Sequence, residues 1–373
     1  MENRNASALI FNGKDKPIEK KSFPLPVKLS DYEVLVSISL STVCGSDVHT
    51  WLGHRSFPTP SVMGHEMVGV IEDIGSKVTT DYLGNKLTKG DRIIWSMTVS
   101  CGNCFFCNNG LPQKCHDMFK YGHSKSDAQP HFTGGFAEYI ILKKGSCIFK
   151  VPSDITDDEA APLMCAGATV TSGLEIANFQ PCDYIVIQGC GALGLYACSF
   201  TKELGAKKVI AIDTIEKRLE LAKLFGADFT INAKKVGEQL VQEVMEITNG
   251  NGADYVVEMT GDPKVITQGI KILRVGGKYI LLGAIYPENF VTIDSSEIIT
   301  KCIQIFGMHN YHPKSLQSAL NLVQKTRTKF PYSKLVGPVF QFSSNGLEDA
   351  FNSLNSKDVI RPALKPNSTN SDF

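Results

Sequence analysis

The feature that most constrains the fold is a regular alternation of short apolar runs and helical segments from Pro181 onward. Short apolar runs bounded by turn residues favour strands that are buried on both faces of a sheet. When helices separate such strands, the sheet is expected to be parallel, with helices on both sides. The expected strands span 184–188, 209–213, 228–232, 255–258 and 278–283, and the expected helices span 192–204 and 216–225.

A glycine-rich turn, G-C-G-A-L-G over residues 189–194, follows the first expected strand and opens the first expected helix. In this arrangement Gly189 makes the tight turn, Gly191 lets the backbone approach a pyrophosphate, and Gly194 allows close helix–strand packing. The N-terminus of the helix favours the negative charge of that pyrophosphate. Because strand, turn and helix occur in the required order, the segment predicts a dinucleotide-binding site.

Asp213 ends the second expected strand, 19 residues after Gly194. A carboxylate there accepts hydrogen bonds from both ribose hydroxyls and repels a 2′-phosphate, which favours NAD over NADP. The alternative is that Asp213 only begins the turn into the next helix. Arg218 argues in the other direction, because a nearby cation can accommodate a 2′-phosphate. We expect NAD, and we also assign Gly283, at the end of the last expected strand, to the cofactor site.

Six of the eleven cysteines fall into two groups that zinc explains better than disulfides. The tighter group has the spacing C-x2-C-x2-C-x7-C, and four close thiolates can enclose a tetrahedral ion, which is typical of a structural zinc. The surrounding loop is rich in Gly and Asn and has little apolar surface to bury, so it needs a metal to hold its shape. The members of this group are Cys101, Cys104, Cys107 and Cys115.

The looser group consists of Cys44, His65 and Cys165, which come from distant segments. Two thiolates and one imidazole leave a coordination position open, which is typical of a catalytic zinc. Glu66 is an alternative or outer ligand, and Asp47 can orient the imidazole through its second nitrogen. Spacing alone does not prove that these residues converge, because a lone His after a glycine is usually a hydrogen-bonded, partly buried imidazole.

The composition excludes several classes of function. The 38 basic and 38 acidic residues balance, so no charge field favours nucleic acid or a membrane surface. The N-terminus shows no secretory signal, and no apolar stretch is long enough to span a bilayer. Cysteine spacing that favours metal therefore points to a reducing cytoplasm. Five cysteines have no expected role: Cys147, Cys182, Cys190, Cys198 and Cys302.

The sequence on either side of the alternating region predicts a mostly-β region in the first third of the chain and a mixed C-terminal region. A length of 373 residues is enough for two domains, each with its own core. The expected elements are strands over 34–40, 68–75, 92–95 and 336–340, a helix start at Thr156, and helices over 313–325 and 346–354.

Together these features resemble the zinc-dependent medium-chain dehydrogenases, the family of alcohol, polyol and threonine dehydrogenases. The resemblance covers residues 6 to 365, nearly the whole chain. It rests on the glycine turn, the four-cysteine loop and three short segments: C-G-S-D over 44–47, G-H-E over 64–66 and G-G-F-A-E-Y over 134–139. These motifs are specific to the family and not to one substrate.

The resemblance implies an α/β fold in two domains. A GroES-like, mostly-β catalytic domain spans 1–166 and carries the structural zinc lobe at 98–118. A Rossmann domain with a doubly wound parallel sheet spans 167–309, and the chain returns to the catalytic domain over 310–373. The resemblance also implies two zinc ions per chain, a small alcohol or aldehyde as substrate, and a homodimer or homotetramer.

By position, the resemblance also assigns roles to single residues. Ser46 receives the alcohol proton, and His49 passes it to solvent by way of the cofactor ribose. Arg361 matches a basic residue that reaches the pyrophosphate, whereas Gly45 stands where some members carry an arginine for that contact. Cys165 completes the catalytic zinc site, although polyol and threonine dehydrogenases usually lack cysteine there.

The segment between the first two zinc ligands has the length usual in the family, which places His54, Arg55 and Phe57 near the substrate entrance. We add Met97 to this group. An arginine at the entrance can pair with a phosphate, phosphonate or carboxylate. The alternative is that Arg55 is a solvated loop charge. Residues 111–115 and 120–123 also resemble a subgroup that is linked to phosphonate metabolism by predicted association.

We therefore expect an oxidoreductase that transfers a hydride between NAD and a small, polar or anionic, primary or secondary alcohol, with a bound zinc that lowers the pKa of the hydroxyl. A polyol or threonine-type dehydrogenase is the alternative within the family. A zinc-free quinone or enoyl reductase of the same fold would lack Cys44, His65 and the loop cysteines. A non-enzymatic metal-binding protein would not need Ser46, His49 or Asp213.

Overall fold

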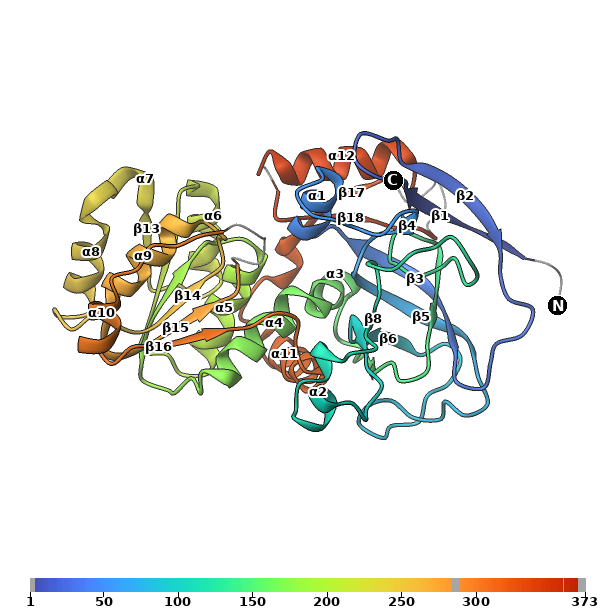
Figure 1. Cartoon of the computed structure of the whole chain (residues 1–373), viewed down its shortest axis with the longest axis horizontal. Helices are drawn as coiled ribbons and strands as arrows, with labels where there is room; N and C mark the ends of the chain where they lie inside the picture. Colours follow the sequence, from blue (N-terminus) through green and yellow to red (C-terminus); the bar gives the residue numbers. More distant parts are fainter. Residues whose placement is uncertain (1–3, 284–288, 358, 368–373) are drawn as a thin grey trace. The chain divides into compact units, whose positions relative to one another are not determined.

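The structure, a computed structural model, describes residues 4–283, 289–357 and 359–367. The chain divides into two compact units (Figure 1). The division differs from the expected one mainly at residues 321–331, which group with the second unit. Among the described residues, no helix is long and apolar enough to cross a membrane. The first unit comprises Met1–Cys165, His312–Leu320 and Tyr332–Phe373, and the second comprises Ala166–Tyr311 and Asn321–Pro331.

The second unit is built on a six-stranded parallel sheet with the strand order β13-β12-β11-β14-β15-β16, which confirms the predicted doubly wound fold. The order steps outward from β11 in both directions, so the topological switch point lies between β11 and β14. Ligands of such sheets bind beyond the carboxyl ends of the strands at this point. The strands are β11 (Tyr184–Gln188), β12 (Lys208–Asp213), β13 (Phe229–Asn232), β14 (Ala253–Glu258), β15 (Leu273–Leu281) and β16 (Gln304–Gly307).

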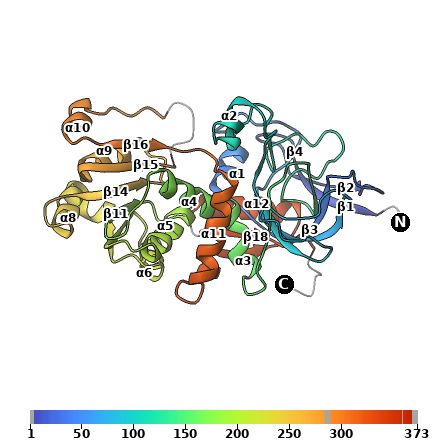
Figure 2. The same ribbon diagram turned by 90° about the horizontal axis from the view of Figure 1, so that it is seen from below.

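Helices lie on both faces of this sheet (Figure 2). Helices α8 and α9 bury Val244 and Ile266 against strand residues such as Val186 and Ile210, which form the core of one face. Helices α5 and α6 lie on the other face. The helices are α4 (Ala166–Ile176), α5 (Ala192–Glu203), α6 (Glu216–Leu224), α7 (Ala233–Val236), α8 (Leu240–Ile247), α9 (Pro263–Ile272), α10 (Ser295–Thr300) and the 3-10 helix η3 (Gly237–Gln239).

The first unit contains a seven-stranded sheet in the order β10-β6-β5-β3-β18-β17, with β9 also paired to β3. A three-stranded sheet, β2-β1-β4, and a two-stranded pair, β7-β8, complete it. The strands are β1 (Asn5–Phe11), β2 (Glu19–Pro24), β3 (Val34–Thr42), β4 (Ser61–Val62), β5 (Glu66–Ile74), β6 (Arg92–Trp95), β7 (Thr98–Val99), β8 (Phe119–Lys120), β9 (Tyr139–Leu142), β10 (Ile148–Lys150), β17 (Val336–Phe340) and β18 (Arg361–Leu364).

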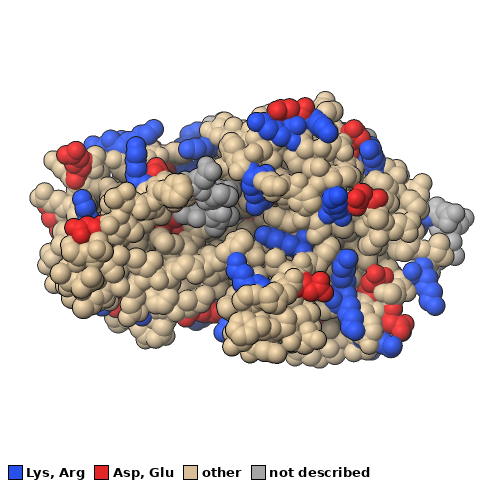
Figure 3. Space-filling model, viewed as in Figure 1, with Lys and Arg blue, Asp and Glu red and all other residues tan. Residues whose placement is uncertain are grey.

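The first unit also contains several helices, and the residues of one further helix are divided between the two units. Helix α11 (Pro313–Thr326) begins in the first unit and ends in the second. Basic and acidic side chains both occur on the visible face of each unit (Figure 3), in line with the balanced charge of the sequence. The other helices are α1 (Gly45–Trp51), α2 (Phe105–Asn108), α3 (Asp157–Ala160), α12 (Ser344–Asn355) and the 3-10 helices η1 (Pro112–Lys114), η2 (Ala161–Met164) and η4 (Tyr332–Leu335).

Strands β3, β5 and β18 are neighbours in the large sheet, and together they form one of its ends. Strand β3 ends at Thr42, which pairs with Glu66 at the start of β5 and with Ala363 in β18. Both neighbours run antiparallel to β3, so the residues just after Thr42 lie beside those just before Glu66 and Ala363. The buried core beneath includes Val43 and Phe136. Segments 43–47, 64–66 and 361–362 therefore meet at this end of the sheet.

Candidate active site and metal centres

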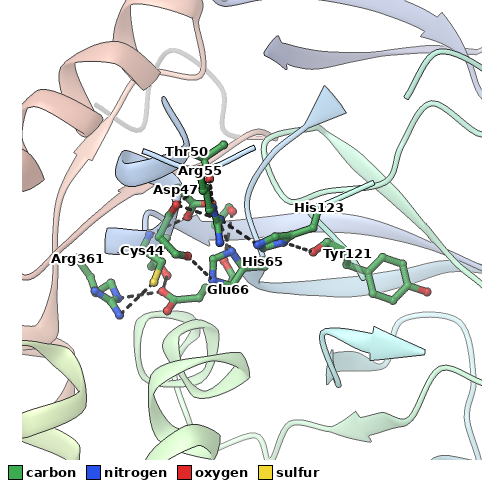
Figure 4. Close-up of polar contacts among 12 residues, drawn as sticks. Cys44, Asp47, Thr50, Arg55, His65, Glu66, Tyr121, His123 and Arg361 are labelled. Carbon is green, nitrogen blue, oxygen red and sulfur yellow. Dashed lines mark hydrogen bonds and ion pairs between the residues drawn. The ribbon is translucent and has the colours of Figure 1, made fainter. Parts of the chain in front are cut away.

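Four ligand side chains meet at this end of the sheet. One atom each from Cys44, His65, Glu66 and Cys165 lies within 4.8 Å of the others. Cys165 follows η2, which packs against β5. The first three of these side chains are buried and Cys165 is half-buried (Figure 4 shows Cys44, His65 and Glu66). All four residues come from the first unit, and their spacing suits a single ion.

The chemistry of this cluster fits zinc. Thiolates, an imidazole and a carboxylate are the ligands that zinc takes in proteins. Burial by itself lowers the pKa of His65, but Asp47 and Cys44 raise it to about 10, so the surrounding groups stabilise a positive charge. In addition, Glu66 Oε1 is buried without a hydrogen-bond partner, which leaves an oxygen donor for a cation. The residues present therefore fit the metal that the sequence predicts.

Helix α1 places two polar side chains, those of Ser46 and Asp47, beside the cluster. Asp47 Oδ2 accepts a hydrogen bond of 2.9 Å from the Cys44 amide, which caps the helix. Its other oxygen, Oδ1, lies 3.3 Å from His65 Nδ1. Ser46 Oγ lies 3.5 Å from His65 Nε2. One carboxylate thus fixes both the start of α1 and the ring of His65, and Ser46 lies beside the metal cluster.

Arg361 lies on the other side of Glu66. Its Nε is 3.0 Å from Glu66 Oε2, which also accepts a 2.6 Å hydrogen bond from Thr42 Oγ1. Its Nη2 is 3.7 Å from Cys44 Sγ. Burial raises the pKa of Glu66 to about 7, and the charge of Arg361 opposes that rise. The sequence suggested contact of Arg361 with a pyrophosphate, which stays a prediction; its pairing with Glu66 was not foreseen.

The predicted proton relay and entrance residues all lie in the first unit. His49 is on α1, and its Nδ1 is 2.9 Å from Nδ1 of the exposed His54. Burial and the charge of His54 lower the pKa of His49, which favours a neutral, proton-accepting imidazole. Phe57 is half-buried and Met97 is buried. Their contact with a substrate stays a prediction.

Two residues near the cluster were not assigned a role by the sequence. The ring of His123 packs edge-on against the ring of His65, with centroids 5.0 Å apart. Burial lowers the pKa of His123 well below its ordinary value, and the charges of Lys120 and His65 add to the effect. Burial also lowers the pKa of Lys120 to about 8, although Cys165 opposes that shift. Both lie in the segment 120–123, for which the sequence gave only a resemblance to a subgroup linked to phosphonate metabolism.

The four-cysteine loop forms a compact second cluster. The sulfurs of Cys104 and Cys107 lie 3.5 Å apart, and those of Cys104 and Cys115 lie 3.8 Å apart. With Zn–S bonds of about 2.3 Å, tetrahedral thiolates are separated by about 3.8 Å. A disulfide needs about 2.0 Å, and all these cysteines are free thiols. Together with Cys101, they fit a structural zinc.

The glycine turn of the second unit has the conformation that its pattern predicts. Gly189 has φ +98°, a left-handed conformation that other residues rarely adopt. A Cβ on Gly194 would lie 1.9 Å from the Gly189 carbonyl oxygen, so the helix and the turn approach too closely for a side chain. A Cβ on Gly191 would meet nothing within 4 Å, so the backbone there is open to a ligand.

Acidic residues organise the carboxyl ends of the strands. Asp213 accepts hydrogen bonds from the amides of Cys190, at 2.7 Å, and Thr214, also at 2.7 Å. Glu258, which the sequence did not single out, is buried at the end of β14 and accepts from the amides of Gly261 and Gly283. These carboxylates fix the loops beyond the switch point.

Arg218 lies on α6 in the same unit, and its Nε is buried without a hydrogen-bond partner. Its charge acts on Cys190 in the glycine turn, so a contact of this guanidinium with a 2′-phosphate of NADP stays a prediction. The structure thus contains both groups on which the choice between NAD and NADP was argued, Asp213 and Arg218.

Comparison with known proteins decides the family. The model of the zinc-binding dehydrogenases matches residues 192–325, and that of the alcohol dehydrogenase GroES-like domain matches residues 30–153. D-xylulose reductase A of Aspergillus oryzae is 32% identical over 350 residues, which cover 91% of each chain. The chain belongs to the zinc-dependent medium-chain dehydrogenases. It is therefore an oxidoreductase of a family whose members use zinc and a pyridine nucleotide.

Two further likenesses agree with this family. An alcohol dehydrogenase of Geobacillus stearothermophilus is 32% identical over 319 residues, covering 84% of this chain and 88% of that one. The crystal structure of an alcohol dehydrogenase from Thermotoga maritima superimposes with a TM-score of 0.92 at 28% identity, covering 97% and 99% of the two chains. The predicted GroES-like and Rossmann architecture of this medium-chain dehydrogenase is thereby confirmed.

Proposed function

We propose that this medium-chain dehydrogenase oxidises a small, polar or anionic, primary or secondary alcohol with NAD, and reduces the corresponding aldehyde or ketone in the reverse direction. The observation that carries the proposal is the cluster of Cys44, His65, Glu66 and Cys165, whose ligand atoms lie within 4.8 Å of one another. Ser46 adds a hydroxyl beside this cluster, 3.5 Å from His65 Nε2.

The side chains around the cluster suit alcohol oxidation. A bound zinc would supply a Lewis acid that lowers the pKa of a substrate hydroxyl, and a bound nicotinamide would accept the hydride. Ser46 Oγ, 3.5 Å from His65 Nε2, would accept the proton of the substrate hydroxyl while it donates its own proton onward. His49, with its lowered pKa, would accept the proton next. Asp47 would keep the ligand ring in one orientation through its contact with Nδ1.

Asp213 supports NAD as the cofactor. Each oxygen of its carboxylate accepts backbone hydrogen bonds, which fixes the side chain at the end of β12. Oδ1 accepts two of these bonds and Oδ2 accepts one, and since each oxygen has two lone pairs, one acceptor site remains on Oδ2 for a ribose hydroxyl. The rival cofactor is NADP, which Arg218 would favour. Comparing the reduction of NAD and NADP with one substrate distinguishes the two.

A polyol is the second candidate substrate, because D-xylulose reductase A is 32% identical to this chain. Cys165 argues against it, since the family resemblance implies that polyol enzymes usually lack a cysteine at this position. A homodimer or homotetramer in the cytoplasm also remains our prediction, and light scattering of the purified protein measures the oligomer.

The test is a screen for NAD reduction over alcohols, polyols and hydroxyalkyl phosphonates, with and without a chelator, together with metal analysis. We expect two zinc ions per chain, and we expect turnover that the chelator abolishes. One zinc ion or none per chain, or turnover that resists complete removal of metal, would contradict the proposal.

A further inference from the structure

Arg55 is held in one place by three acceptors of the first unit. Its Nε donates to Thr50 Oγ1 at 2.7 Å, and its Nη2 donates to the Ser46 carbonyl oxygen at 3.1 Å. Its Nη2 also lies 3.2 Å from His123 Nε2. Such an arginine is preorganised, because its side-chain freedom is already lost before a ligand arrives. The alternative of a freely solvated loop charge therefore does not describe Arg55.

His123 connects Arg55 with the metal cluster, because it contacts both Arg55 and His65. Its Nδ1 lies 3.2 Å from the Tyr121 carbonyl oxygen, so Nδ1–H donates to that oxygen and Nε2 accepts from Arg55. The ring of His123 also packs edge-on against the ring of His65. One imidazole thus contacts both the guanidinium of Arg55 and the ring of a predicted zinc ligand (Figure 4).

Within residues 4–283, 289–357 and 359–367, the guanidinium of Arg55 has no carboxylate partner. Among the described residues, no carboxylate lies within ion-pair distance of Arg55, and none of its hydrogen bonds uses Nη1. The nearby carboxylates are engaged elsewhere, Asp47 with the Cys44 amide and Glu66 with Arg361. Phe57 covers one face of the guanidinium, with a centroid distance of 5.7 Å.

A second cation lies close by. Lys120 is half-buried in β8, and its carbonyl oxygen accepts a hydrogen bond from the His123 amide. The charge of Arg55 lowers the pKa of its ammonium group, and that of Cys165 raises it. Two cationic side chains, Arg55 and Lys120, therefore lie next to the metal cluster, and they attract an anionic group more than a neutral one.

We propose, on the basis of the dehydrogenase function proposed above, that Arg55 binds an oxyanion of the substrate, a carboxylate or a phosphonate, while the hydroxyl is at the metal cluster. His123 is a positioning residue that holds Arg55, and Lys120 strengthens the local positive potential. The substrate class is thus a short alcohol that carries an anionic group close to the carbon that is oxidised.

The experiment compares matched substrates with the zinc-loaded enzyme. Each short hydroxy acid is paired with its neutral methyl ester, and each hydroxyalkyl phosphonate is paired with its neutral dimethyl ester. Comparing the two series separates carboxylate from phosphonate. For Arg55→Leu we expect kcat/KM to fall about 10- to 100-fold for the anionic member and to change little for the ester, as for loss of a hydrogen bond to a charged group. Arg55→Lys should recover part of this loss, because lysine restores the positive charge but not the paired N–H donors of the guanidinium.

A binding measurement keeps the test independent of turnover. Calorimetric titration with propionate or methylphosphonate, which have no hydroxyl, should show binding to the wild-type protein, weakened at least tenfold in Arg55→Leu. His123→Leu should raise KM for anions more than it lowers kcat, and His123→Gln, which keeps an acceptor, should restore KM. Zinc content is measured for each variant, because His123 contacts His65.

The outcomes separate the two proposals. If wild type oxidises an ester as well as its acid, and Arg55→Leu binds both anions as tightly as wild type, the anion site is wrong while the dehydrogenase function stands. If no alcohol is oxidised but the anions still bind through Arg55, the dehydrogenase proposal fails and the anion site remains.

Discussion

Glu66 Oε2 lies 3.0 Å from Arg361 Nε, and both side chains are almost completely buried beside the metal cluster. The pair connects the start of β5 with the start of β18, two strands that both pair with β3. A buried ion pair is costly to break from one side, because the remaining charge is left without compensation.

The first prediction concerns this pair. Arg361→Met should lower the free energy of unfolding by about 3 to 5 kcal/mol, because it leaves Glu66 buried without its cation. The double variant Glu66→Gln with Arg361→Met should recover most of that loss. Denaturant unfolding of the zinc-loaded proteins measures both effects. Equal losses in the single and double variants would show that the charge pairing is not the cause.

The second prediction separates the two metal centres. Cys107→Ser should reduce the zinc content from two ions per chain to one and lower stability, because the sulfur cluster of the loop loses a ligand. Cys147→Ser is the matched control, since Cys147 is a free thiol outside both clusters. Metal analysis after gel filtration provides the measurement. Two retained zinc ions in Cys107→Ser would contradict the assignment.

The third prediction concerns pH and the unexpected grouping of residues 321–331 with the second unit. Glu203 on α5 pairs with Lys329 at 2.7 Å and with Lys325 at 2.9 Å, and these contacts lower its pKa. A lowered carboxyl pKa contributes stability above the ordinary value of about 4.3, and that stability is lost as pH falls through the lowered value.

Glu203→Gln should therefore lower the free energy of unfolding by about 1 kcal/mol at pH 7, a small effect because the lysines are exposed. The difference from wild type should disappear toward pH 3. Urea unfolding between pH 3 and pH 7 tests this. A constant difference across that range would mean that the carboxylate charge is not involved.

The fourth prediction concerns the cofactor. Asp213→Asn keeps the size of the side chain but removes the charge and one acceptor, so we expect KM for NAD to rise about tenfold, the cost of one hydrogen bond to a charged group. The preference for NAD over NADP should narrow at the same time. Steady-state kinetics with both cofactors measures the change. An unaltered KM for NAD would show that Asp213 serves only the backbone amides that it already binds.

The sequence was sufficient wherever a local pattern determines the structure. Residues 184–188 and 189–194 predicted a strand and a glycine turn because apolar runs and positive φ angles are local requirements. The spacing of Cys101 to Cys115 likewise predicted a compact metal loop. By contrast, helices α8 and α9 were not predicted, although Asp262 as the N-cap and Pro263 in the first turn give α9 a helix-start signal.

The contacts around the metal cluster could not be read from local patterns. Arg361 reaches Glu66 through the pairing of β18 with β3, a partnership between segments more than 300 residues apart. Lys120 ends the short strand β8 and His123 follows it, and only the folded chain brings them to Arg55 and His65. The family resemblance supplied the zinc ligands, but it assigned no role to His123 and Lys120, which support our proposal of an anionic substrate.

The most direct measurement follows alcohol-dependent NAD reduction and zinc content together, while zinc is removed by a chelator and then restored. Our account predicts two zinc ions per chain at full activity, loss of activity with loss of the ion at Cys44, His65 and Cys165 while the chain stays folded, and recovery on readdition of zinc. Full activity in a metal-free chain, or no alcohol-dependent reduction of NAD by the protein with two zinc ions, would contradict it.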